Sequence, residues 1–156
     1  MAKIKIIVVG RTKEGFLRKG EAFYLERLKR YITAEWVEVK PSKIRKGSRE
    51  SDIMAEEGRA IEAGVTKRDH VIAMDPSGKM YDSPGLAERI NKLLSSSDRL
   101  VFITGGPLGL SRETISSAHE VLSLSPLTFT HEMARLVLLE QLYRAFTIMR
   151  GEKYHK

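Results

Sequence analysis

The segment at residues 99–110, RLVFITGGPLGL, constrains the fold more than any other part of this chain. Its four apolar residues at 100–103 predict a short strand that is buried on both faces. The glycines and the proline that follow let the backbone turn sharply and approach a bound molecule, because glycine has no Cβ. Ligands of α/β sheets bind beyond the carboxyl ends of the strands. The turn is therefore a candidate binding site, and a tight turn that binds nothing is the alternative.

Four further segments predict strands, and five predict helices. Short apolar or alternating runs indicate strands at residues 3–9, 34–39, 70–74 and 121–124, the second of them nearer the sheet edge. Apolar residues at helical spacing, together with capping residues, indicate helices at residues 14–31, 52–63, 83–95, 111–119 and 131–149. Strands that alternate with helices predict an α/β fold with a mostly parallel sheet and helices on both faces. We expect one domain over residues 1–156, because no repeat or linker divides the chain.

Three local features carry expectations of their own. The aromatic residues of the first helix follow its apolar stripe, which predicts packing in the core rather than a platform for base stacking. Ser51 or Asp52 is expected to cap the second helix, and Gly64 to end it. The sequence Asp-Pro-Ser-Gly at residues 75–78 predicts a turn after the third strand. Asp75 has two interpretations there, a cap of that turn or a partner for a ribose or an amine.

The helix expected at residues 131–149 is apolar on more than one stripe. Such a helix needs a second surface to cover it. We expect that surface to come from another copy of the chain, which predicts a symmetric homodimer. The short polar segment GEKYHK follows this helix and carries Tyr154 and His155.

Composition bounds the setting and the partners of the protein. Cysteine is absent, which excludes disulfides and thiolate chemistry and is typical of a reducing compartment. The apolar run near the start is too short for a signal peptide or a membrane span, so we expect a cytoplasmic protein. The formal net charge is +7, which favours a polyanionic partner such as nucleic acid. Five basic residues lie in the aperiodic segment 40–49, which is either a solvated linker or an arm that contacts phosphates.

Several common catalytic signatures are absent from the sequence. The four histidines, His70, His119, His131 and His155, show no spacing that would bind a metal ion, so we predict no metal site. The segment GRTKEGFL lacks the lysine and hydroxyl residue of a P-loop, and no G-x-S-x-G or G-x-G-x-x-G motif occurs. Methyl transfer from an activated sulfonium donor fits this pattern, because the protein then mainly aligns two substrates.

Three segments together give the chain a specific resemblance: FITGGPLGL at 102–110, LSLSPLTFTHEMAR at 122–135 and LLEQLYRAFTIMRGEKYHK at 138–156. The chain resembles the ribosomal RNA large-subunit methyltransferase H family, in the SPOUT superfamily of S-adenosylmethionine-dependent enzymes, over essentially its whole length. The resemblance implies a homodimer with a C-terminal trefoil knot that methylates N3 of a pseudouridine in large-subunit (23S) ribosomal RNA. Chain-connection rules alone argue against a knot.

The resemblance also implies roles for individual residues. It places the methyl donor, S-adenosylmethionine, against the ends of three predicted strands, at Met74, Gly105, Leu124, Ser125, Pro126, Leu127, Thr128 and Phe129. It places catalytic and RNA-facing groups at His131, Arg135, Arg144, Tyr154 and His155. Ion pairing on the last helix is an alternative role for the two arginines. Pro126 stands in a variable position of the loop, and Glu132 stands where many relatives have Gln or Pro.

Two other functions stay open on the residues alone. A non-enzymatic RNA-binding module would use the same basic surface, and a small-molecule enzyme would use the glycine turn for an anionic ligand. Binding of S-adenosylmethionine separates the methyltransferase from the binding module, and salt dependence separates RNA binding from the third function. The sequence identifies no general base, although a neutral histidine suits removal of a proton from N3 near pH 7.

Overall fold

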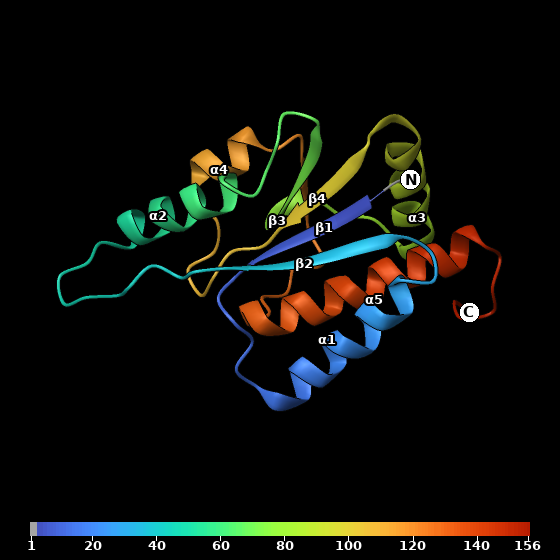
Figure 1. Cartoon of the computed structure of the whole chain (residues 1–156), viewed down its shortest axis with the longest axis horizontal. Coiled ribbons are helices and arrows are strands. Elements are labelled where there is room, and N and C mark those ends of the chain that lie inside the picture. The colour runs from blue at the N-terminus through green and yellow to red at the C-terminus, as the bar shows by residue number, and fades with distance from the viewer. Residues whose placement is uncertain (1–2) are drawn as a thin grey trace.

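The computed structural model describes residues 3–156, which form a five-stranded sheet with helices on both faces (Figure 1). The strands are β1 (Lys3–Val9), β2 (Thr33–Val39), β3 (Asp69–Lys79), β4 (Arg99–Ile103) and β5 (Glu120–Leu122). The helices are α1 (Gly15–Leu28), α2 (Glu50–Glu62), α3 (Ser83–Ser96), α4 (Arg112–Ser117) and α5 (His131–Met149). The strand order is β2-β1-β4-β3-β5, and every neighbouring pair is parallel. The predicted parallel α/β fold, with β2 at an edge, is confirmed.

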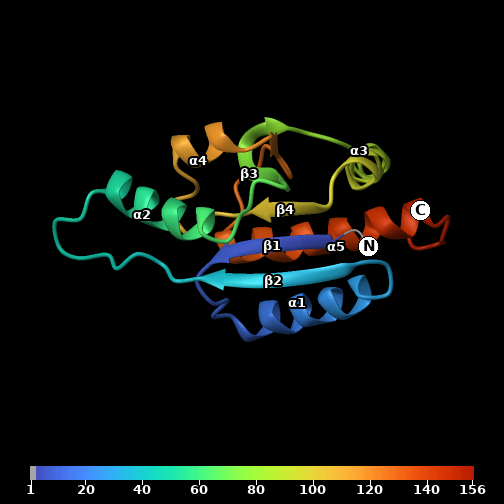
Figure 2. The ribbon, with the colours of Figure 1, turned by 45° about the horizontal axis from the view of Figure 1, so that its top comes forward.

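Alternation along β1 explains why the sheet has a core on each face. Ile4, Ile6 and Val8 belong to the core that α1, α3 and α5 cover, whereas Ile7 and Val9 belong to the core under α2 and α4. All five side chains are at most 3% exposed. Figure 2 shows α2 and α4 on the opposite side of β1 and β2 from α1. A parallel strand that is buried on both faces is apolar at successive positions, which is the pattern of the second half of β1.

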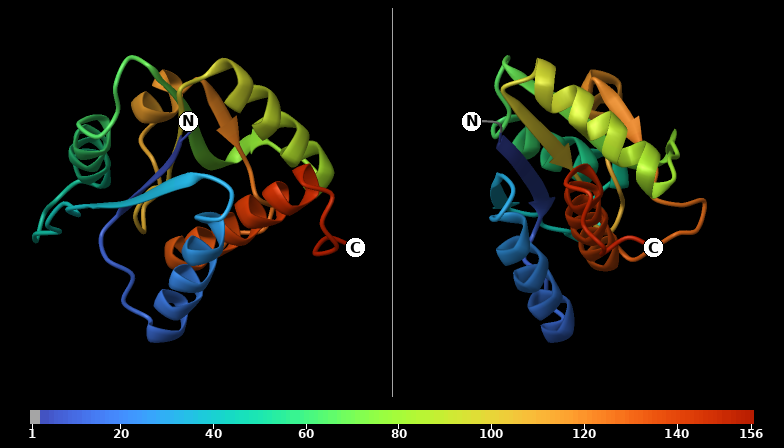
Figure 3. Two further views of the ribbon diagram at one scale, coloured as in Figure 1. Left: turned by 45° about the vertical axis from the view of Figure 1, so that its right-hand side comes forward. Right: turned by 90° about the vertical axis from the view of Figure 1, so that its right-hand side faces the viewer.

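The long helix α5 packs between α1 and α3 against the sheet (Figure 3). Leu138, Leu139 and Leu142 are all 0% exposed in this setting. One apolar stripe is therefore covered by helices and strands of the same chain. Met133, Leu136 and Val137 stay half-buried, so the homodimer that would cover them stays a prediction.

Helix α1 exposes part of its aromatic content. Phe16 is 65% exposed and Phe23 is 47% exposed, whereas Tyr24 and Tyr31 pack against the core. The prediction that all these aromatics are core residues is therefore wrong for the two phenylalanines. Helix α1 lies beside β2 and α5. Only one stripe of the helix, which ends at Leu28, is therefore fully buried.

Two boundaries differ from the sequence prediction. Helix α2 begins at Glu50, its N-cap residue is Arg49, and no side chain caps it; Ser51 and Asp52 lie in its first turn instead. The predicted turn at 75–78 is a bulge within β3, because Met74 and Lys79 both pair with Leu122 of β5. The chain leaves the ladder for four residues and returns to it, so the turn residues are present although the strand continues.

A buried ion pair joins β3 to β4 at the edge where the strands begin. Asp69 and Arg99 are register partners, and the Arg99 Nε atom donates to Asp69 Oδ1 over 2.7 Å. Burial raises the pKa of Asp69, but the Arg99 guanidinium and the Thr66 N–H stabilise the carboxylate and lower the pKa overall. The stability that this pair contributes is present above the pKa of an unfolded Asp and is lost as pH falls through the lower folded value.

Candidate active site

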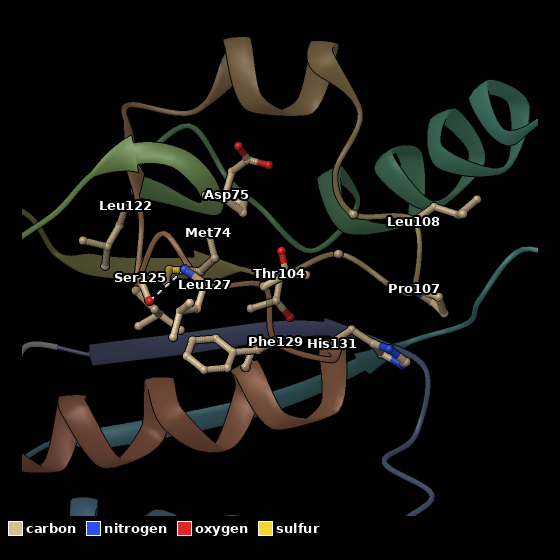
Figure 4. A pocket seen from close by; sticks show the side chains of 17 residues that line it. Met74, Asp75, Thr104, Pro107, Leu108, Leu122, Ser125, Leu127, Phe129 and His131 are labelled. Carbon is tan, nitrogen blue, oxygen red and sulfur yellow. Dashed lines mark hydrogen bonds between the residues drawn. The ribbon is translucent and has the colours of Figure 1, made fainter.

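A pocket of about 320 Å³ lies at the carboxyl ends of β3, β4 and β5 (Figure 4). It is bounded below by the first turn of α5. Its lining consists of three strand ends and the loops that follow them: Met74, Asp75, Pro76, Thr104, Gly105, Gly106, Pro107, Leu108, Gly109, Leu122, Leu124, Ser125, Leu127, Thr128, Phe129, His131 and Ala134. Parallel strands end at the same edge of a sheet, which is why segments so far apart in the sequence meet here.

The glycine turn after β4 folds back on itself. Gly106 and Gly109 form an antiparallel bridge, and the Gly109 N–H donates to the Gly106 carbonyl over 3.0 Å. A Cβ on Gly105 would lie 2.4 Å from the Gly109 carbonyl carbon, so only glycine fits there. Gly109 has a φ of +83°, whereas Gly105 has no positive φ. The turn thus presents main-chain groups to the pocket in place of side chains.

Seven of the eight residues that the resemblance assigns to the methyl donor line this pocket, and Pro126 does not. The loop that holds five of them is shaped by local hydrogen bonds. Ser123 Oγ donates to the Ser125 carbonyl over 3.1 Å, and the Leu127 N–H donates to Ser125 Oγ over 3.0 Å. These bonds leave Leu127 72% exposed at the pocket mouth.

Asp75 caps the bulge of β3, and its role as a partner for a ribose or an amine stays a prediction. Its Oδ2 atom accepts hydrogen bonds from the Ser77 N–H, at 2.9 Å, and from the Ser77 hydroxyl. It also lines the pocket beside Met74. The carboxylate therefore shapes the bulge of β3 and gives the pocket a negative charge at its rim.

His131 begins α5 and lines the pocket on the side opposite the strand ends. The helix start is fixed by Thr130, whose Oγ1 atom accepts a hydrogen bond from the Met133 N–H over 3.2 Å. Burial, together with the positive charges of Arg135 and Lys13, lowers the pKa of His131, while the Glu132 carboxylate opposes the shift. The lowered pKa favours the neutral imidazole, which has one acceptor nitrogen in either tautomer.

The structure does not place Arg135 where RNA could reach it. Its side chain is 0% exposed, and its guanidinium donates to the carbonyls of Val9 and Gly10 and, over 3.0 Å, to Thr12 Oγ1. Thr12 in turn donates to Glu21 of α1 over 2.7 Å. Arg135 thus fastens the loop that follows β1 to the first turns of α5. The prediction of an RNA-facing Arg135 is wrong because these carbonyls have no partner within the sheet.

The remaining predicted residues lie at the far end of α5. Tyr154 packs edge-on against Tyr143, and its hydroxyl donates to Glu140 over 3.1 Å. Arg144 pairs with Glu140 and approaches His155 Nδ1 at 3.1 Å. Because arginine only donates, Nδ1 of His155 is the acceptor in this contact and the other ring nitrogen carries the proton.

The length of α5 separates this cluster from the pocket of the same chain. The helix has 19 residues, and a rise of 1.5 Å per residue gives it a length of about 28 Å. His131 lies at its start, whereas the segment with Tyr154 and His155 follows its end. The structure therefore brings His131 to the pocket, whereas Arg144, Tyr154 and His155 gather near Glu140, outside the pocket lining. Figure 3 shows the chain end beyond the C-terminal end of α5.

Several polar residues that position the site were not identified from the sequence. Glu132 accepts hydrogen bonds from the N–H groups of Lys13 and Glu14, at 2.9 and 3.2 Å, so it holds the loop before α1. Glu57 is 5% exposed and one of its oxygens has no hydrogen-bond partner, although the other accepts from the Ser42 N–H. Their spacing along the helices is that of ordinary surface residues, so only the assembled fold reveals their burial.

Comparison with known proteins identifies the family. Residues 2–155 match the sequence model described as "Predicted SPOUT methyltransferase". The chain belongs to the SPOUT methyltransferase family. Proteins named "Ribosomal RNA large subunit methyltransferase H" from Halothermothrix orenii and Bacillus pumilus are 42% and 43% identical to it, over 99% and 98% of this chain and 99% of each relative.

A solved structure supports the fold at greater distance. A probable methylase family protein from Haemophilus influenzae Rd KW20 superposes with a TM-score of 0.59 at 16% sequence identity. The superposition covers 98% of this chain and 70% of that one. Within the described residues of this SPOUT family member, no helix is both long and apolar enough to cross a membrane.

Proposed function

We propose that this protein transfers a methyl group from S-adenosylmethionine to N3 of a pseudouridine in large-subunit ribosomal RNA. The observation that carries the proposal is the pocket itself, because seven of the eight residues assigned to the donor by family resemblance line it. The full-length relatives are named as methyltransferases of that RNA, which supports the substrate class. Such a reaction belongs in the cytoplasm, where ribosomes are found.

The pocket suits a nucleoside-containing donor. Its volume of about 320 Å³ lies within the usual range of small-molecule sites, and its walls are mostly apolar, as at Met74, Leu124 and Phe129. The main-chain groups of the glycine turn supply the polar contacts that hold a ligand in one orientation. S-adenosylmethionine, when bound, supplies an electrophilic methyl group on a sulfonium sulfur. The protein then has to align the target base and remove its proton.

His131 is the residue we propose to accept the N3 proton. Its ring is at the pocket and is neutral at pH 7 because its pKa is lowered. Replacing His131 by Asn is expected to reduce the rate at saturating substrates by about 100-fold or more, which is typical for loss of a general base. The base works only when unprotonated, so the wild-type rate falls as pH drops through the pKa of His131.

Rates of methyl transfer between pH 5 and 8 test this role. The wild-type protein should lose activity on the acid side, and the residual activity of His131→Asn should lose this dependence on pH. Calorimetric binding of S-adenosylmethionine controls for damage to the pocket and should change little. A variant with a normal rate, or with an unchanged acid limb, would exclude His131 as the base.

We further propose that the active species is a homodimer. Phe16 and Phe23 leave exposed apolar surface on α1, which a second copy of the chain would cover. Tyr154 and His155 do not line the pocket of their own chain; they contact Glu140 and Arg144, about 14 and 20 Å along α5 from His131, so they would serve the pocket of the partner. In a symmetric dimer, the tail of each chain would lie at the pocket of the other chain, so both sites would be completed at once.

Methylation of isolated large ribosomal subunits tests the proposed function directly. Subunits from a strain that lacks this protein are incubated with the purified protein and S-adenosylmethionine, and the RNA is digested for mass spectrometry. We expect one pseudouridine to gain 14 mass units, a figure that is roughly the mass of an added methylene group, with the methyl at N3. Binding of RNA without binding of the donor would favour the non-enzymatic module instead.

A further inference from the structure

The segment at residues 40–49, named the basic arm here, leaves the sheet at the same edge as the pocket. Strand β2 is parallel to β1, β4, β3 and β5, so its carboxyl end lies on the side where the pocket opens. Figure 2 shows the arm extending beyond the strands on that side, between β2 and α2. The arm is therefore placed beside any RNA strand that enters the pocket.

The root of the basic arm is fixed, whereas its tip is exposed. The Ser42 N–H donates to Glu57 over 3.1 Å, and the Ser42 hydroxyl donates to Glu56 over 2.9 Å. A small turn closes the tip, where the Ser48 N–H donates to the Arg45 carbonyl and the Arg45 N–H donates to Ser48 Oγ, both at 2.9 Å. Glu56 and Glu57 of α2 are thus bound to the root, while Asp52 of the first turn lines the groove beside the tip without an ion pair to it.

The basic side chains of the arm have no acidic partners. Within residues 3–156, no carboxylate lies within 4.0 Å of the charged groups of Lys40, Lys43, Arg45, Lys46 or Arg49. All five residues are exposed. Elsewhere, Arg99 pairs with Asp69 and Arg89 pairs with Glu120. The arm therefore places five unpaired cations in one short segment, at the end of the sheet where the pocket opens.

The arm and the first turns of α2 also border an open groove of about 690 Å³. Lys43, Arg45 and Arg49 are among the residues that line it. A groove with cations along one side follows the sugar-phosphate backbone of a single strand without reading its bases. The hydrogen bonds at Ser42 and the groove distinguish the arm from a solvated linker, which would have neither feature.

We infer that the basic arm binds the phosphate backbone of ribosomal RNA next to the target nucleotide. This inference rests on the proposed function, and it names the surface that holds the substrate while the pocket acts on one base. The arm contributes affinity that is independent of base sequence, and it takes no part in donor binding or in the chemical step. The occupant is RNA because the arm carries five unpaired cations and leaves the sheet at the end where the pocket opens.

Two triple variants with the same change in charge test the inference. The arm variant replaces Lys43, Arg45 and Lys46 by Gln. The control variant replaces Lys3, Lys67 and Arg68 by Gln, at exposed positions without ion pairs near the end of the sheet where β1 and β3 begin. Each removes two lysines and one arginine and lowers the formal net charge from +7 to +4. Both are measured for binding to full-length 23S ribosomal RNA between 50 and 300 mM salt, and for methylation of large ribosomal subunits.

We expect the arm variant to lose about 50-fold in RNA affinity at 0.15 M salt and the salt slope to fall by about 2, because each cation on a single strand contributes roughly 0.7 to that slope. Its KM for subunits should rise, while kcat and donor affinity stay near wild type. The control variant should stay within about twofold of wild type. Equal losses in both variants, or no loss in the arm variant, would overturn the inference. Absence of methyl transfer by the wild-type protein would overturn the proposed function, and the inference with it.

Discussion

Deleting residues 154–156 is expected to lower methyl transfer to ribosomal subunits by about 100-fold or more, with donor affinity and the proposed dimer nearly unchanged. The deletion removes the Tyr154 hydroxyl and the His155 imidazole, which hydrogen bond to the half-buried Glu140 and Arg144 in the second half of α5. Neither residue belongs to the core or lines the donor pocket of its own chain. Loss of a group that positions the substrate has effects of this size on the rate, even when binding and stability are retained.

Methylation kinetics with large subunits measure the loss, and a chain that lacks only Lys156 is the matched control. The competing view is that this segment is an ordinary frayed terminus, for which turnover would be near normal. Near-normal turnover would therefore exclude a composite site that uses the tail.

Mixed dimers decide which pocket the tail serves. One subunit lacks residues 154–156, and the other carries Gly105→Val. If each tail serves the partner's pocket, one site in the mixed dimer has both defects and the other has neither, so about half of a normal dimer's activity returns. If each tail serves its own pocket, both sites are defective and activity does not return.

Replacing Gly105 by Val is expected to abolish measurable binding of S-adenosylmethionine. The reason differs from the one that the sequence suggested, which was a Cβ projecting into the ligand. The Cβ would instead lie 2.4 Å from the carbonyl carbon of Gly109, so the turn itself has to open. Overpacking of this kind costs about 1–3 kcal/mol of folding stability, and the displaced turn no longer presents its main-chain groups to the donor.

Gly15→Val is the matched control for this substitution, because a Cβ at Gly15 meets no atom within 4 Å. Calorimetry gives the donor affinity of both variants, and thermal melting shows whether each remains folded. Gly105→Ala should show the same loss in milder form, since the overlap begins at the Cβ. Normal donor affinity in a folded Gly105→Val protein would mean that the donor binds elsewhere.

The sequence predicted the sheet and the place of the pocket because both depend on local patterns. Runs such as residues 6–9 and 100–103 are apolar over consecutive positions, which is typical of buried parallel strands. The glycine turn and the segment 124–129 follow such strands, and parallel strands place their ends together. The trefoil knot implied by the resemblance stays a prediction, because it depends on the path of the chain rather than on any local pattern.

The errors arose where tertiary contacts decide what a side chain does. Arg135 has the spacing of a cation on the helix surface. Its guanidinium is buried instead, because it donates hydrogen bonds to the carbonyls of Val9 and Gly10. Phe16 and Phe23 fit an apolar stripe, but α1 lies at the border of the sheet and leaves them exposed. The spacing of apolar residues shows that one face of a helix packs against the protein. It does not show how many residues on that face the neighbouring elements bury.

The bonds from Arg135 to the end of β1 also constrain the order in which a new chain can finish folding. All five strands are synthesised before α5, yet α5 supplies the guanidinium for the carbonyls of Val9 and Gly10 and much of the core under one sheet face. A nascent chain that ends before α5 exposes those carbonyls and a row of apolar side chains to water. Native packing at the first strand therefore waits for the last helix, and the apolar face that α5 covers stays open to aggregation until α5 has emerged.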